Sequence, residues 1–297
     1  MSIAVACGQP ARRRYRLRRA IVEAGSIMLA IVLLIWSLLP VYQMLLIALD
    51  PEEGEIEFDG NIWTAEPSLE GFRAVVTQEA RYLEHFWHQF GNSLFIGLLT
   101  MVLTVLIGSL ASFAVTRMRL SKGSLLTNAA LLTYAIPASF LIVPYFRIMH
   151  SYGLSENLWA VIASQVTFAT PFAILILQLY GSFVPFELDD AARVDGASAV
   201  QVYWRIYLRL MMPALAVVAI YALLLAWNDY LFAAVLLAVR NMTVAVTQGQ
   251  LFSDTDAPWN AMMAAAIIHV LPPIALLFAL RRHVLASLTT SGVKGYS

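Results

Sequence analysis

The sequence predicts an all-α polytopic membrane protein with six transmembrane helices and with both termini in the cytoplasm. Composition is the first observation: 60% of the 297 residues are hydrophobic and only 13% are charged, whereas soluble domains average about 45–50% apolar and about 25% charged residues. The second is a set of apolar runs that each reach the roughly 20 residues needed to span a bilayer. These six runs are residues 24–49, 91–116, 124–146, 158–180, 213–239 and 259–280.

The distribution of basic residues is the third observation, and it orients the chain. The segments 1–23, 117–123, 181–212 and 281–297 hold 15 of the 19 Lys and Arg residues. The segments on the opposite side hold only Arg73, Arg81, Arg147 and Arg240. Because loops rich in Lys and Arg stay in the cytoplasm, the first set of segments, which includes both chain ends, is predicted to be cytoplasmic.

The N-terminal part is predicted to contain a basic cytoplasmic segment, 1–23, and a first transmembrane helix, 24–49. Basic residues before an apolar run can also mark a signal peptide, but no small-residue cleavage pattern interrupts this run, so a retained span is predicted. Residues 50–90 then form an acidic loop that faces outward, with ten acids and two arginines. The single cysteine, Cys7, excludes an internal disulfide and a multi-cysteine metal site.

Residues 91–280 are predicted to form a core of five further transmembrane helices. The first of them carries small residues at intervals of three or four, which places them on one helical face. These residues are Ser93, Gly97, Thr100, Thr104, Gly108 and Ser112. Such a stripe favours close packing of helices in lipid; lining of a pore is the other interpretation.

Polar side chains inside the predicted spans are candidate site residues. Asp229 is the one carboxylate placed within a span, near the middle of run 213–239, and a charge there is expected to face a wet cavity or a partner. Trp227 and Asn228 beside it offer a stacking surface and an amide, which suit sugars, although the three residues could equally pack against another subunit. His269 has no ligand-type neighbour at metal spacing, so a buried histidine is predicted there.

The longest internal cytoplasmic segment, 181–212, is predicted to fold as two helices around a glycine corner. Pro185 suits the first position of a helix, and the acids that follow suit its positive end. Gly196 suits the left-handed residue that ends the helix, and Ser198 can cap the next one. The small residues of this loop allow it to dock on another protein; contact with lipid headgroups alone is the alternative.

Motifs in this loop resemble the EAA loop of ABC importer permeases, whose pattern is E-A-A, three residues, G, nine residues, I-x-L-P. This chain has Asp190-Ala191-Ala192, then Gly196, then Ile206 and Leu208 at the same spacing. It departs from the pattern at Asp190, which replaces glutamate, and at Arg209, which replaces proline. Further similar segments are 168–172, 185–188, 227–232 and 292–295, and together they resemble the MalG-like group of carbohydrate-uptake permeases.

The resemblance implies the transmembrane domain of a type I ABC importer in the bacterial cytoplasmic (inner) membrane. Relatives of this kind pair with a second, MalF-like permease and with two copies of an ABC ATPase, which binds ATP and Mg²⁺. A periplasmic or lipid-anchored sugar-binding protein delivers the substrate. No cofactor and no catalytic or metal site is expected on this chain itself, and no nucleic acid partner is expected.

The resemblance also implies a role for particular residues. Docking on the ATPase is expected to involve Asp190, Ala191, Ala192, Asp195, Gly196, Ile206 and Leu208. The segment 241–250 corresponds to one that reaches the binding protein's sugar cleft, through Thr247, Gln248, Gly249 and Gln250. The tail residues Val293, Lys294 and Gly295 are expected to contact the ATPases; a disordered basic end is the alternative.

Other function classes fit the sequence less well. It contains no GxxxxGK[ST], HExxH or GxSxG motif, and Ala192-Arg193 precedes Asp195-Gly196, the reverse of the order in CDP-alcohol phosphotransferases. A secondary transporter usually has paired intramembrane charges or an internal repeat, and neither is found here. An ABC permease for a solute other than sugar remains the main alternative.

Overall fold

The structure is a computed structural model that describes residues 9–51, 63, 66–79, 83–118, 123–251 and 258–292. Helices make up its regular structure, and the described residues contain no strand. The chain divides into a smaller unit, residues 1–72 with 258–264, and a larger unit, residues 73–257 with 265–297.

The smaller unit contains the first long helix, α1 (Gln9–Ala48), and the beginnings of α2 (Glu70–Thr77) and α13 (Trp259–Gly292). These ends pack closely: the Asn260 side-chain amide donates to the Asp50 carbonyl at 3.1 Å. A Cβ on Gly71 would lie 2.8 Å from the Asn260 carbonyl oxygen. Many large apolar side chains between Ile21 and Val41 of α1 are exposed, as expected for a helix that faces lipid or a partner subunit.

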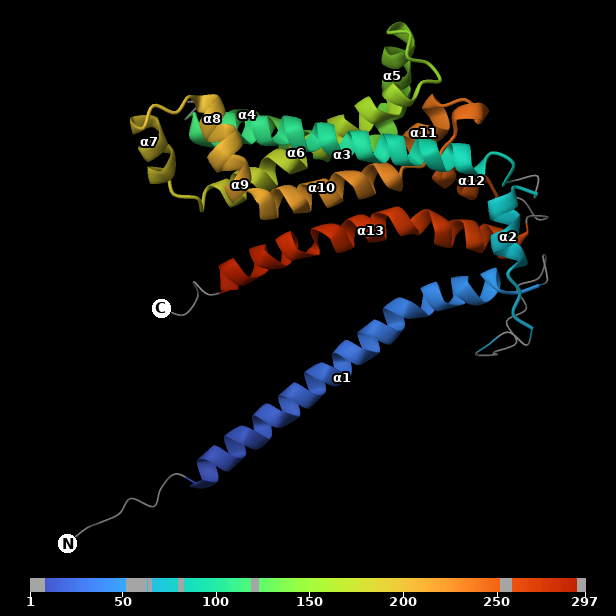
Figure 1. The fold of residues 1–297 in the computed structure, drawn as a ribbon, viewed down its shortest axis with the longest axis horizontal. Coiled ribbons are helices and arrows are strands. Elements are labelled where there is room, and N and C mark those ends of the chain that lie inside the picture. Colours follow the sequence, from blue (N-terminus) through green and yellow to red (C-terminus); the bar gives the residue numbers. More distant parts are fainter. Residues whose placement is uncertain are drawn as a thin grey trace. The chain divides into compact units, whose positions relative to one another are not determined.

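Three long helices form the centre of the larger unit: α3 (Phe86–Arg117), α6 (Leu158–Gly181) and α10 (Met212–Trp227). They lie side by side along most of their lengths (Figure 1). A Cβ on Gly108 would lie 2.8 Å from the Ala173 Cβ of α6, and one on Gly97 would lie 3.2 Å from Trp227 of α10. The small-residue stripe of α3 therefore serves close helix packing, which confirms that interpretation over pore lining.

Four described helices are individually long and apolar enough to cross a membrane, within α1, α3, α6 and α13. A fifth is reached if Ala199–Leu210 and Met212–Trp227, which meet at an angle of 79°, count as one span. The predicted run 124–146 instead forms α4 (Gly123–Leu132), a 3₁₀ turn (Thr133–Ala135) and α5 (Ala138–Ser151). Ile136 is extended there because a following proline disfavours helical backbone. Six spans and two cytoplasmic termini remain predictions.

The expectation that run 213–239 is one helix is wrong. Helix α10 ends at Trp227, and the shorter α11 (Leu231–Leu236) follows after a break. A 3₁₀ turn (Val239–Asn241) and α12 (Val244–Leu251) complete this part of the chain.

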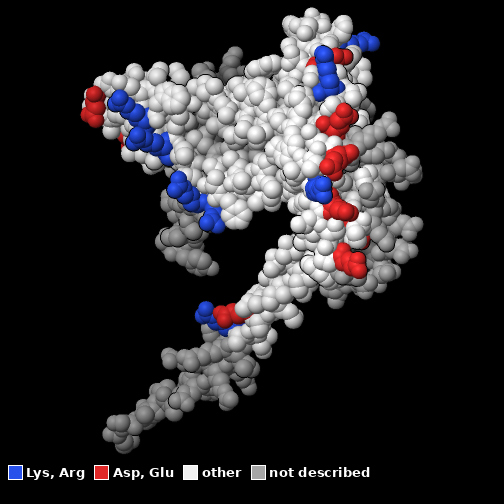
Figure 2. Space-filling view, turned by 45° about the vertical axis from the view of Figure 1, so that its right-hand side comes forward, with Lys and Arg blue, Asp and Glu red and all other residues white. Residues whose placement is uncertain are grey.

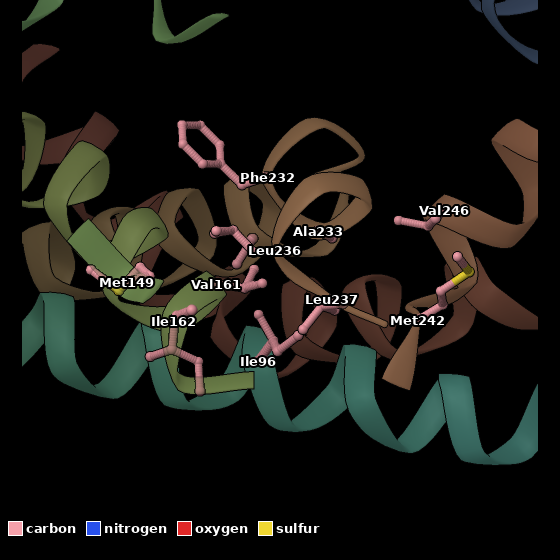
Figure 3. Packing of buried hydrophobic residues seen from close by; sticks show 12 residues of the cluster. Ile96, Met149, Val161, Ile162, Phe232, Ala233, Leu236, Leu237, Met242 and Val246 are labelled. Atoms are coloured by element: carbon pink, nitrogen blue, oxygen red, sulfur yellow. The ribbon is translucent and has the colours of Figure 1, made fainter. Parts of the chain in front are cut away.

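Buried apolar side chains hold these short helices against the long ones (Figure 3). Ile96 of α3 and Val161 of α6 belong to one cluster with Phe232 of α11 and Val246 of α12. Polar contacts fix the same end of α3: the Val244 N–H donates to the Ser93 hydroxyl at 3.1 Å. The broken helices are therefore packed elements with a defined position in this unit.

Candidate functional site

The glycine corner predicted in segment 181–212 is present. Helix α7 (Glu187–Val194) carries Glu187, Asp189 and Asp190 in its first turn; it begins two residues after Pro185. Gly196 has a φ of +85°. Its N–H donates to the Arg193 carbonyl at 3.0 Å, and the Ala197 N–H donates to the Ala192 carbonyl at 2.9 Å. This pair of bonds is a Schellman motif, the helix ending that favours glycine.

The second half of the loop begins with the predicted serine cap. The Gln201 N–H donates to the Ser198 hydroxyl at 3.4 Å, and the Ser198 N–H donates to the Gln201 side chain at 2.8 Å, which completes a capping box. Helix α8 (Ala199–Val202) continues as a π-helix (Tyr203–Tyr207) and then as α9 (Leu208–Leu210). The π-helix is a departure from the regular second helix that was predicted to follow Ser198.

The residues predicted to contact an ATPase divide by exposure. Asp190, Ala191, Asp195 and Gly196 are exposed, whereas Ala192, Ile206 and Leu208 are half-buried. Ala192 and Leu208 pack against a buried cluster that includes Tyr203 and Tyr207. Basic side chains gather at this end of the larger unit (Figure 2), among them the exposed Arg193, Arg205 and Arg209. The loop thus has one anchored side and one free side.

Sequence reasoning missed the contacts that anchor the loop. The Arg117 guanidinium, at the end of α3, lies 3.4 Å from the Asp189 carboxylate, and both side chains are almost fully buried. The Tyr203 and Ser109 hydroxyls are 2.7 Å apart, and the Tyr207 hydroxyl donates to Ser112 at 3.1 Å. The signal in the sequence was an arginine directly after an apolar run and an acid directly before the quoted motif.

A second candidate site lies where two predicted spans are broken. A cavity of about 750 Å³ is lined by residues of the α4–α5 break, of α6, and of the α10–α11 break. Its polar and aromatic lining consists of Thr133, Gln165, Phe168, Tyr221, Asn228, Asp229, Tyr230 and Phe232. Non-helical backbone at membrane depth is tolerated where it is buried in protein or lines a water-filled cavity, so both breaks have a physical reason to lie here.

Asp229 does not lie in mid-helix as predicted; it caps α11. Its two carboxylate oxygens accept from the Phe232 N–H at 3.4 Å and the Ala233 N–H at 2.9 Å. The three neighbouring candidates are also divided: Asn228 and Asp229 line the cavity, whereas Trp227 is buried and stacks on His269 with ring centroids 4.7 Å apart. His269 is buried, as predicted.

Replacing Asp229 by asparagine is expected to change transport by no more than a few-fold, because asparagine caps helices about as well as aspartate. Asp229→Leu removes both acceptors and is expected to cost roughly 0.5–2 kcal/mol of stability. Uptake and thermal melting of the assembled complex measure the two effects. A changed solute preference in Asp229→Asn would show instead that the carboxylate contacts the solute.

The residues predicted to reach a binding protein lie on a helix, α12, and not on an irregular loop. Thr247, Gln248 and Gly249 are half-buried and Gln250 is exposed. Gly249 is adjacent to the ring of Tyr230, so α12 lies beside the lining of the cavity. The tail residues Val293, Lys294 and Gly295 lie outside the described residues.

The structure has helices that can span a membrane, a cavity where helices are broken, and a loop anchored on one side and exposed on the other. Together these features are those of a membrane transport component. The chain belongs to the family of binding-protein-dependent transport system inner membrane components. The sequence profile of this family matches residues 104–289.

Relatives and a solved structure agree with this family. The chain is 32% identical to the inner membrane ABC transporter permease protein YcjP of Escherichia coli K12, over 88% of this chain and 93% of that one. It is 31% identical to the trehalose transport system permease protein SugB of Mycobacterium tuberculosis, over 88% and 93% of the two chains. Its fold is similar to a chain in the crystal structure of a bacterial ABC transporter for alginate, with a TM-score of 0.69, 20% identity and coverage of 88% and 96%.

Proposed function

We propose that this chain forms half of the translocation pathway of an ATP-driven importer for a carbohydrate that an external binding protein delivers. The observation that carries the proposal is the family match over residues 104–289, since that family serves binding-protein-dependent transport. The trehalose permease SugB, with 31% identity across most of both chains, supports a carbohydrate, probed first as a disaccharide. The complete transporter would add a second permease, two ATPases that bind ATP and Mg²⁺, and the binding protein.

The cavity at the helix breaks supports this class of solute. Phe168 and Tyr221 offer ring faces, and Gln165, Asn228 and Asp229 offer amide and carboxylate groups around the same space. Aromatic faces pack on the apolar faces of sugar rings, and side-chain amides and carboxylates bond to hydroxyl groups. In this proposal the cavity is the part of the pathway that this chain contributes, and the partner permease completes it.

The anchored loop supports the ATP-driven class. Its exposed side, Asp190 with Ala191, Asp195 and Gly196, is the surface that would enter a groove on the ATPase. The basic side chains around it (Figure 2) agree with a cytoplasmic position. In this arrangement, closure of the two ATPases on ATP would move α7 and so change the packing of the membrane helices.

Transport by the complete complex in proteoliposomes tests the proposal. The partner permease, the ATPases and the binding protein are combined with this chain, and uptake of labelled trehalose and maltose is measured with and without ATP. Accumulation that requires both ATP and the binding protein is expected. Uptake that follows an ion gradient without ATP would contradict the ATP-driven class, and ATP-driven uptake of amino acids but not of sugars would contradict the carbohydrate. Omission of the binding protein is the control.

A further inference from the structure

We propose that the buried ion pair between Arg117 and Asp189 is the positioning link through which movement of α7 is passed to the transmembrane helix α3. The inference rests on the proposed docking of α7 on an ATPase. It adds the route by which that docking reaches the membrane, and it assigns a role to two residues outside the EAA-type motif.

Helix α7 is attached to the rest of the unit by very little buried surface. Asp189 is its one buried residue, and the side chains of Asp190 and Ala191 beside it are exposed. Ala192 adds a half-buried methyl group against the neighbouring apolar cluster. A helix held in this way can move as a rigid body. Any displacement of α7 then acts on the rest of the unit mainly through the buried Asp189 carboxylate.

Arg117 gathers three segments at one guanidinium. Its Nη1 atom lies 3.4 Å from the Asp189 carboxylate. Its Nη2 atom donates to the Val184 carbonyl at 3.1 Å and to the Gly181 carbonyl at 3.4 Å. The same group lies over the Phe186 ring, 4.7 Å from its centroid. Since Arg117 is the last residue of α3, it joins this helix to the end of α6, to the linker and to α7.

Burial and opposite charge hold this pair together, although Arg117 Nη1 and Asp189 Oδ2 are not hydrogen-bonded to each other. Both side chains are almost fully buried, with exposed fractions of 1% and 6%. A buried charge that loses its partner is strongly unfavourable, so the two groups are expected to move together instead of separating. Exposed pairs, in contrast, are screened and exchange with water.

Two hydroxyl contacts fasten the second half of the loop to the same helix. The hydroxyls of Tyr203 and Ser109 are hydrogen-bonded to each other, and the Tyr207 hydroxyl donates to the Ser112 hydroxyl; both contacts are buried. Together with Arg117 these contacts span residues 109–117 of α3, a rise of about 12 Å at 1.5 Å per residue. Both ends of the loop therefore act on α3, whose opposite half carries the small-residue contacts with α10. We infer that α3 receives the movement first.

The test uses the complete transporter with single variants of this chain. Asp189→Asn and Arg117→Met remove one charge each. Glu84→Gln and Arg147→Met make the same chemical changes at exposed positions outside segment 181–212 and are the matched controls. Assembly of the complex, ATP hydrolysis and uptake are measured, and uptake per ATP is the deciding quantity because a loss of folded complex lowers uptake and hydrolysis alike.

We expect Asp189→Asn and Arg117→Met to lower uptake per ATP by about tenfold, in the range of typical coupling effects. The controls should stay within about twofold, as is usual for surface substitutions. Asp189→Glu keeps the carboxylate and should restore most of the uptake that Asp189→Asn loses.

If a single variant fails to assemble, the double variant Arg117→Met with Asp189→Leu tests the inference instead. This double variant leaves no unpaired buried charge. We expect this double variant to assemble and still show low uptake per ATP. Normal uptake per ATP in the double variant, or in Asp189→Asn, would overturn the inference and leave the pair a packing element. Absence of ATP-driven uptake in the unaltered complex would instead contradict the proposed function, so the two failures are distinguishable.

Discussion

Replacing Gly196 by glutamate is expected to abolish uptake while the chain still enters the membrane and ATP hydrolysis continues without transport. Gly196 has a φ of +85°, a conformation that costs other residues roughly 1–2 kcal/mol. No atom lies within 4 Å of the position that a Cβ would take, so the new side chain would project from the free side of the loop. There it would meet the docking surface of the ATPase.

Gly153 offers a matched control for this substitution. It also has a positive φ, +70°, and open space around its Cβ position, but it follows α5 and lies outside segment 181–212. Gly153→Glu therefore imposes a similar backbone strain and should keep uptake. Uptake and ATP hydrolysis are measured on both variants in proteoliposomes. A loss of uptake in Gly196→Glu alone is then due to lost docking on the ATPase and not to backbone strain. Normal uptake in Gly196→Glu would show that this corner does not meet the ATPase.

Replacing Gly108 by leucine is expected to destabilise the bundle severely. A Cβ there would already lie 2.8 Å from the Ala173 Cβ of α6, a separation too short for two carbon atoms. Larger side chains forced into a packed core typically cost about 1–3 kcal/mol, and here the leucine must also push α3 away from α6. We expect a lower melting temperature of the purified complex and a lower yield of assembled protein.

Gly91→Leu is the control for Gly108→Leu, because Gly91 lies on the same helix with no atom within 4 Å of its Cβ position. Its melting temperature should equal that of the unaltered chain. Equal melting of both variants would mean that α3 and α6 are free to separate. The interpretation of the stripe as a packing surface would then be wrong.

The parts of the fold that could be read from the sequence are those that depend on local chemistry or on periodicity. The spacing of Gly97 and Gly108 predicted a packing face, and Gly196 with Ser198 predicted the corner and the cap. Tertiary contacts were not readable in this way. Asp229 was taken for a charge within a helix, because nothing local shows that α10 ends at Trp227 and that the carboxylate caps the next helix.

The candidate site shows the same division. The exposed residues of the loop, such as Asp190, belong to a motif with fixed spacing, so the sequence pointed to them. Asp189 is adjacent in sequence, yet its importance depends on Arg117, 72 residues earlier along the chain. Such a pair forms only because α3 and α7 contact each other in the folded chain. The spacing of residues in one sequence does not reveal that contact.

The π-helix of Tyr203–Tyr207 has a consequence for protein engineering. A π turn accommodates one residue more than an α turn, and one residue corresponds to about 100° of rotation on an α-helix. In a loop that stays α-helical throughout, the side chains of α9 and of the start of α10 would therefore point in directions rotated by about 100° from those seen here. A chimera that joins this loop to the membrane helices of another permease should be cut before Tyr203 or after Tyr207, so that the extra residue is either exchanged whole or kept whole.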